Sequence, residues 1–285
     1  MVSTSTIIAV IVTFFISMIL PIVAWIVYGV KNKGKGAFTA WLIGAAGFFV
    51  MQMVIRTPIL NTLALNEGFQ LFVVNHYVLY CLVVAFTAGL FELVGRYIVA
   101  KILAKNLTYE KGFAAGLGHG GIEAIVIVGM LYLNNIIYIA MINSGGFDGI
   151  VEQTAAMGVD ATSLIAIKDG LLNANATVFL LAGYERLLTM IFHVAATLVV
   201  CYFVSKKQDV KGLLICLVCH WMVDFVAPLV NGMATAYLGN VISQTTAYII
   251  VYVFLTVVAV VSSIVIFNIR IRMSKLHFDE YGTNI

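Results

Sequence analysis

Three pairs of ionisable residues lie four positions apart inside apolar stretches of the chain. They are Glu92 with Arg96, His119 with Glu123, and His220 with Asp224. Residues at this spacing share one face of a helix, so each stretch directs two polar groups the same way. His193 lies in a further apolar stretch. Carboxylates and imidazoles gathered together could activate water and stabilise an oxyanion, which is what peptide-bond hydrolysis requires.

The candidate groups could divide the work of a hydrolase among them. Glu92 or Glu123 could be the base that activates water, and Arg96 could orient Glu92. His193 and His220 could donate to the oxyanion or protonate the leaving amine. The sequence contains neither H-E-x-x-H nor G-x-S-x-G, which disfavours a zincin or serine mechanism of the familiar kind.

Metal chemistry is a second interpretation of the same residues. His119, Glu123, His193 and His220 would make a zinc ligand set. Asp224 would then hold His220 in one tautomer, as acidic residues behind ligating histidines do. The hypothesis without a cofactor is preferred, and zinc is its alternative.

The composition places all these residues in a membrane protein. Of 285 residues, 62% are hydrophobic and 10% are charged, against roughly 45–50% and about 25% in soluble domains. This excludes a water-soluble enzyme, a disordered tail and a nucleic-acid binder. The net charge of +3 is too small to indicate a polyanionic partner. We expect one integral membrane domain over 1–285, all-α because a lipid-embedded backbone must satisfy its own hydrogen bonds.

Seven apolar runs are near or above the ~20 residues that a spanning helix needs. They cover 6–30, 37–55, 70–100, 112–142, 174–204, 212–230 and 243–268. The first is interpreted as a retained helix rather than a signal peptide. Lysine and arginine concentrate in alternate connections and in the tail, at 31–35, 101–111, 206–211 and 270–275. This asymmetry predicts an outside N-terminus and a cytoplasmic C-terminus.

The buried ionisable residues share a depth within these runs. Glu92 is nine residues from Lys101, or about 14 Å at the rise of a helix. The other candidates lie eight to thirteen residues from the nearest cytoplasmic lysine: His119, Glu123, His193, His220 and Asp224. Four helices therefore place polar groups at one level, which predicts a shared polar cavity in the cytoplasmic half. Glu185 and Arg186 are expected outside it.

Three further segments have weaker signals. Residues 56–69 are predicted to form an irregular outer loop, and residues 143–173 a short amphipathic helix on the outer surface. Gly112, Gly116 and Gly120 form a small-residue stripe that permits close helix contact, with a helix of the same chain or with a substrate helix.

The ordered set of motifs between 70 and 230 resembles the YhfC family, which is related to the PrsW proteases and the type II CAAX prenyl endopeptidase superfamily. Phe91-Glu92-Leu93-Val94-Gly95-Arg96 is similar to a first motif that usually carries two glutamates, of which one is present here. The stretch Gly116–Glu123 is similar to a PrsW segment that ends in Glu. His193 resembles the third-motif histidine, and His220-Trp221-Met222-Val223-Asp224 resembles the last motif.

The resemblance implies a glutamic-type intramembrane protease. Glu92 would activate the water, with Glu123 as the alternative base, and His193 and His220 would bind the oxyanion. We therefore expect a multi-pass protein of a bacterial plasma membrane that cuts a membrane protein or membrane-bound peptide. A non-catalytic scaffold that binds partner helices, a zinc-dependent form of the protease and a proton-coupled transporter are the alternatives. The sequence leaves the oligomeric state open.

Overall fold

A computed structural model describes the backbone of residues 1–281 and the side chains of residues 1–274. This part of the chain is helical and contains no strand. Seven helices are long and apolar enough to cross a membrane, as the sequence predicts: Thr4–Lys31, Ala37–Ala64, Tyr77–Asn106, Tyr109–Ser144, Ala176–Ser205, Asp209–Met233 and Gln244–Ser274. The chain is therefore a multi-pass membrane protein. The C-terminal end, expected in the cytoplasm, lies outside the described residues.

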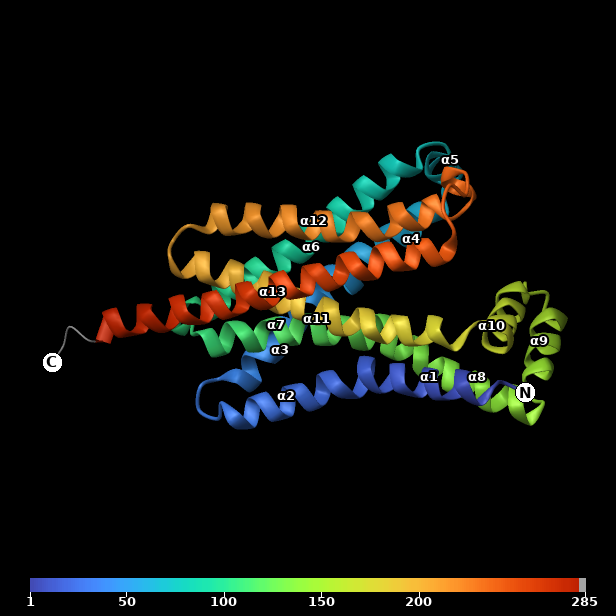
Figure 1. Cartoon of the computed structure of the whole chain (residues 1–285), viewed down its shortest axis with the longest axis horizontal. Coiled ribbons are helices and arrows are strands. Elements are labelled where there is room, and N and C mark those ends of the chain that lie inside the picture. Colours follow the sequence, from blue (N-terminus) through green and yellow to red (C-terminus); the bar gives the residue numbers. More distant parts are fainter. Residues whose placement is uncertain (282–285) are drawn as a thin grey trace. The chain divides into compact units, whose positions relative to one another are not determined.

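The spans are assembled from α-helical, π-helical and 3-10 segments (Figure 1). The α-helices are α1 (Thr4–Phe14), α2 (Leu20–Lys31), α3 (Ala37–Phe48), α4 (Thr57–Ala64), α5 (Glu67–Asn75), α6 (Tyr77–Leu103), α7 (Tyr109–Glu123), α8 (Met130–Ser144), α9 (Phe147–Ala156), α10 (Thr162–Asn173), α11 (Ala176–Ser205), α12 (Asp209–Met233) and α13 (Gln244–Tyr281). The others are η1 (Phe15–Ile19), η2 (Phe49–Arg56), η3 (Ala104–Asn106), η4 (Ala124–Gly129) and η5 (Ala236–Leu238).

The π-helical segments η1, η2 and η4 interrupt three of the spans. A π-helix bonds each residue to the fifth along the chain, so it holds more residues per turn than an α-helix. Residues on either side of such a segment therefore change face relative to the usual 3.6-residue period. Such segments occur frequently at functional sites.

The prediction of an irregular loop over 56–69 is wrong. The second span continues from η2 into α4, and α5 follows after a short turn. Pro58 lies in the first turn of α4, where its missing N–H has no helical partner to lose. His76, with φ −132° and ψ 44°, separates α5 from α6, so the third span begins at Tyr77 rather than at 70.

The segment 143–173 contains two short helices rather than one. Gly145 ends α8 and Gly158 follows α9, both with a positive φ that glycine adopts without strain. Lys168 of α10 forms an ion pair with Asp148 of α9. Asp160 accepts from the backbone N and the hydroxyl of Thr162, and these bonds lower the pKa of its carboxyl.

The chain divides into two compact units. The first comprises Met1–Val23 and Glu123–Leu187, and the second Ala24–Ile122 and Leu188–Ile285. In the first unit, a hydrophobic core forms from Val2, Val10, Tyr132, Ile139 and Leu171. The second unit carries every candidate site residue except Glu123. The prediction of one domain remains a prediction.

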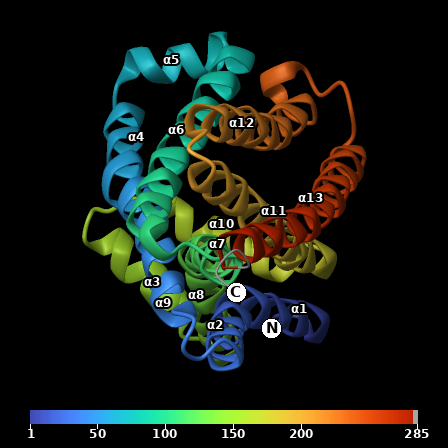
Figure 2. The same cartoon turned by 90° about the vertical axis from the view of Figure 1, so that its left-hand side faces the viewer.

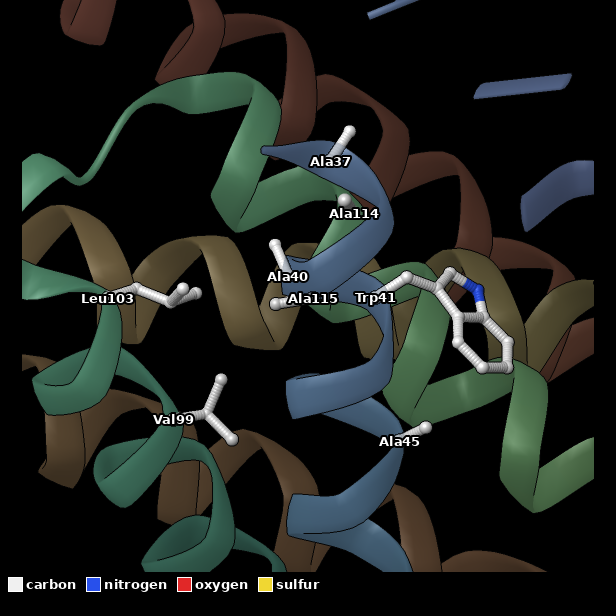
Figure 3. Close-up of a cluster of buried hydrophobic side chains, with 8 residues drawn as sticks. All are labelled: Ala37, Ala40, Trp41, Ala45, Val99, Leu103, Ala114 and Ala115. Carbon is white, nitrogen blue, oxygen red and sulfur yellow. The ribbon is translucent and has the colours of Figure 1, made fainter. Parts of the chain in front are cut away.

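Within the second unit, α6 and α12 lie side by side along their length (Figures 1 and 2). A core cluster joins α3, α6 and α7, with Ala114 and Ala115 of α7 beside Ala37 and Ala40 of α3 (Figure 3). The backbones of α3 and α7 approach closely at Gly118, where a Cβ would overlap the carbonyl oxygen of Trp41. Because glycine has no side chain, it permits this close contact.

The glycine stripe of α7 packs against α11 of the same chain. A Cβ on Gly116 would meet Val194, and a Cβ on Gly120 would meet Met190 and His193. This contact brings α11 against the face of α7 that also carries His119. The stripe therefore positions two candidate histidines beside each other.

Candidate active site

One carboxylate oxygen, Oε2 of Glu92, is the centre of the site. It lies 3.0 Å from Arg96 Nη2 and 3.0 Å from His119 Nε2. His220 Nε2 is 3.3 Å away and His193 Nδ1 is 3.7 Å away. All five side chains are buried, and Glu92 is only 5% exposed. The structure thus brings three imidazoles and a guanidinium from four helices, α6, α7, α11 and α12, around one oxygen.

Arg96 joins Glu92 to His193. Its Nη2 lies 2.6 Å from Nδ1 of His193 while it also donates to Glu92. A guanidinium can only donate, so Nδ1 must accept, and a neutral His193 carries its proton on Nε2. The ring proton is therefore on the nitrogen that does not face Arg96, as an oxyanion donor would require.

His220 lies between two carboxylates. Its Nε2 is 3.3 Å from Glu92 Oε2 and 3.2 Å from Asp224 Oδ2, so Nε2 carries a proton. The Asp224 side chain is 31% exposed, whereas His220 is 1% exposed. Asp224 thus contacts the His220 ring from the more exposed side of the cluster. This is the orienting role expected from its four-residue spacing.

Several buried polar atoms of the cluster have no hydrogen-bond partner among the described residues. They are Nδ1 of His119, Nδ1 of His220, and Nε and Nη1 of Arg96. Buried polar atoms are nearly always paired, so such atoms indicate where water or a ligand binds. The cluster therefore offers polar atoms beyond those that Glu92 uses.

The second span supplies two residues that the sequence analysis did not assign to the site. Gln52 of η2 donates to Glu92 Oε1 at 2.8 Å and to the carbonyl of Ala88 at 3.2 Å. Arg56 donates to Gln52 Oε1 at 3.3 Å, which fixes the amide with its NH₂ toward Glu92. Gln52 lies in the apolar run 37–55 and Arg56 directly follows it, with the same four-residue spacing as the three ionisable pairs. That spacing was the available signal.

Glycine also sets the position of α12 beside Glu92. A Cβ on Gly89 of α6 would lie 3.5 Å from the ring and Cβ of His220. Gly89 precedes Glu92 by three residues and lies on nearly the same face of α6. His220 can therefore pack directly against the α6 backbone and reach the carboxylate.

Glu123 has a different set of partners. It forms an ion pair of 2.9 Å with Arg186, which is also paired with Glu185. These three residues lie in the unit that contains α8 to α10.

The donor set of the cluster fits a zinc ion by chemistry. The two groups with converging ligand atoms are Glu92 with His119 and His193, and Glu92 with His220 and Asp224. Tetrahedral zinc with bonds of about 2 Å places ligand atoms roughly 3.3 Å apart, close to the 3.0 and 3.3 Å between Glu92 Oε2 and His119 or His220. Nδ1 of His193 instead accepts from Arg96.

Comparison with known proteins identifies similar sequences. A family model described as YhfC intramembrane metalloprotease matches residues 16–251. The chain is 31% identical over 197 residues to the uncharacterized membrane protein YhfC of Bacillus subtilis (strain 168), covering 68% of this chain and 73% of that protein. No solved structure matches.

Proposed function

Because the chain belongs to the YhfC family, whose model is described as an intramembrane metalloprotease, we propose that it is an endopeptidase in which Glu92 activates water within the membrane. The observation that carries this proposal is the convergence of three imidazoles and Arg96 on one oxygen of Glu92. The substrate is a membrane protein or a membrane-bound peptide. The protein acts in a bacterial plasma membrane, with its lysine-rich helix ends toward the cytoplasm.

Glu92 is the base in this mechanism. Its Oε1 is held by Gln52 and its Oε2 by Arg96, so the carboxylate is fixed in place before substrate binds. Attack of a water on the scissile carbonyl transfers one water proton to Glu92 and forms a tetrahedral oxyanion. The protonated Glu92 then returns this proton to the leaving amine.

The histidines stabilise the negative charge that develops during attack. His193 carries its proton on Nε2 because Arg96 occupies Nδ1. His220 lies between the carboxylates of Glu92 and Asp224, which favour its imidazolium form, and the N–H at its Nδ1 is then the second donor. Donors fixed in a site without bulk water stabilise an oxyanion more strongly than water does, because they need no reorientation. His119 supports Glu92 through a bond of 3.0 Å.

A zinc-dependent form of the same protease is the second candidate, favoured by the family description and by the donor set. The residues that would hold the ion are Glu92 with His119 and His193, or Glu92 with His220 and Asp224. A bound zinc supplies Lewis acidity and a water acidic enough to attack at neutral pH. In that form Arg96 would orient Glu92 as a ligand.

A peptide cleavage assay with purified protein in detergent tests the proposal. A panel of synthetic single-span peptides is incubated with the protein, and new peptide termini are identified by mass spectrometry. Glu92→Gln should abolish cleavage at every site that the parent protein cuts. Glu152→Gln, which removes an exposed carboxylate of α9, should cleave as the parent does. Cleavage by Glu92→Gln at the parent rate would refute a catalytic role for Glu92.

A further inference from the structure

A groove with a volume of about 830 Å³ opens where α11 ends and α12 begins. Three lysines line it: Lys101 from α6, Lys207 from the connecting turn and Lys211 from α12. Val204, Leu214 and Ile215 form an apolar wall. We call this feature the basic groove. All its residues belong to the second compact unit, and the turn can be followed in Figure 1.

The basic groove carries uncompensated positive charge. Asp209 is the single carboxylate of its lining, and it is already paired with Lys101 and accepts from the Tyr97 hydroxyl at 3.0 Å. Lys207 and Lys211 form no ion pair with any described residue. Two ammonium groups therefore face the groove without an internal counterion.

The backbone of the turn and one aromatic contact shape this part of the groove. Lys207 has a left-handed φ of 57° in a turn closed by bonds from Lys207 N to Val204 O and from Gln208 N to Phe203 O. The ammonium of Lys211 lies 5.5 Å from the centre of the Phe203 ring. A cation over an aromatic face is attracted to it, so this contact restrains the side chain. The ordered turn and the Phe203 ring thus form the part of the basic groove from which the exposed Lys207 and Lys211 project.

The position of the groove relates it to the membrane boundary. One spanning segment ends at Ser205 and the next begins at Asp209, so the turn lies where lipid headgroups meet the hydrocarbon. From this turn an apolar stripe runs along α12 at four-residue spacing. Its members Val210, Leu214, Val218 and Met222 are between 52% and 70% exposed.

We propose that the basic groove binds the phosphate headgroup of an anionic glycerophospholipid, with an acyl chain along the stripe of Val210, Leu214, Val218 and Met222. Basic pockets between spanning helices are suited to such headgroups. A free phosphate would satisfy the two ammonium groups but would leave the stripe unused. The charge and the continuous apolar face together therefore favour a lipid.

Such a lipid would stabilise the packing of α6 against α12, the two helices that carry Glu92 and His220. The Lys101–Asp209 ion pair joins α6 to α12 at the groove. Glu92 lies on α6 and His220 on α12. A ligand that binds only the folded arrangement stabilises it by mass action. The proposal concerns binding and does not depend on the protein being a protease.

Native mass spectrometry of the full chain in detergent tests the site, with phosphatidylglycerol and phosphatidylcholine as probes. The parent should retain phosphatidylglycerol in preference to phosphatidylcholine, and added phosphatidylglycerol should raise its unfolding temperature. In Lys207→Gln with Lys211→Gln, the affinity for phosphatidylglycerol should fall at least about tenfold, because both unpaired charges are lost. Lys207→Arg with Lys211→Arg keeps the charges and should retain binding, which controls for misfolding.

Lys31→Gln with Lys33→Gln is the matched control, because it removes two exposed lysines, one at the end of α2 and one in the connection to α3. Its affinity for phosphatidylglycerol should equal that of the parent. An equal loss in both double variants would mean diffuse electrostatic attraction and would overturn the site. Equal retention of the two lipids, or displacement of phosphatidylglycerol by glycerol 3-phosphate at similar concentration, would overturn the lipid assignment.

Discussion

Arg96 and His193, separated by 97 positions in the chain, are joined through a contact of 2.6 Å between Nη2 and Nδ1. The same Nη2 donates to Glu92 at 3.0 Å, so one nitrogen links the Glu92 carboxylate to the His193 imidazole. Because a guanidinium has no acceptor, this contact determines the tautomer of neutral His193. The relative placement of α6 and α11 is thus coupled to the chemistry of the site.

Removal of Arg96 should destabilise the protein, because it leaves the buried Glu92 carboxylate without its cationic partner. Arg96→Met leaves the Glu92 carboxylate without its guanidinium, and we expect the free energy of unfolding to fall by about 3–5 kcal/mol. Glu92→Gln in the same chain should recover much of this loss, because the unpaired charge is removed as well. Thermal or denaturant unfolding in detergent gives the four values of the cycle. Additive effects would contradict an electrostatic link between the two residues.

Gln52 should act as a positioning residue for Glu92. Gln52→Leu removes the 2.8 Å bond to Oε1, so we expect the cleavage rate to fall about tenfold and stability to fall by about 1.5–3 kcal/mol. Gln52→Glu places a second carboxylate beside Glu92 and should impair cleavage further. Peptide cleavage and unfolding are measured on the same preparations. Parental rates in both variants would show that Glu92 needs no support from η2.

Gly118 should be intolerant of a side chain. A Cβ there would overlap the carbonyl oxygen of Trp41, so Gly118→Ala must move α7 away from α3. We expect the free energy of unfolding to fall by about 1–3 kcal/mol. Gly170→Ala is the matched control, since nothing lies within 4 Å of a Cβ on Gly170 in α10. There the higher helix propensity of alanine should leave stability equal or raise it by up to about 1 kcal/mol. The two unfolding temperatures distinguish close packing from a general effect of alanine.

Glu123 should support the fold rather than the chemistry. Glu123→Gln removes one of the two carboxylates paired with Arg186. We expect the free energy of unfolding to fall by about 1–3 kcal/mol. Cleavage per folded molecule should remain within about twofold of the parent rate, because in our proposal the base is Glu92. A well-folded Glu123→Gln protein without activity would make Glu123 the base instead.

Chelation distinguishes the glutamic form of the protease from the zinc form. With Glu92 bonded to Arg96 and Gln52, we expect cleavage to continue after dialysis against a membrane-permeant chelator, with zinc well below one ion per chain. Metal content is measured by atomic emission on the protein used for cleavage. Loss of activity on chelation, its return with zinc, and reduced zinc content in His119→Ala would establish the metal-dependent form.

The sequence alone determined the class of protein, and it predicted most of the residues that the structure brings around Glu92. A charged fraction of 10% and seven apolar runs are sufficient for a helical membrane protein, because the bilayer requires each spanning segment to satisfy its own backbone. The four-residue spacing in Glu92–Arg96 and His220–Asp224 predicted their contacts, which are local to one helix. The shared depth of His119, His193 and His220 followed from counting along the spans.

The tertiary structure alone decided which side chains meet across helices. His119 and Glu123 also share a four-residue spacing, yet His119 contacts Glu92 while Glu123 pairs with Arg186. Gln52, near the end of the expected span 37–55, and Arg56, at the start of the expected loop, join the site through the π-helix η2. Hydrophobic periodicity could not reveal this, because lipid-facing and protein-facing sides of a spanning helix are both apolar. Backbone approach at glycines and the wider turn of a π-helix set the facing surfaces instead.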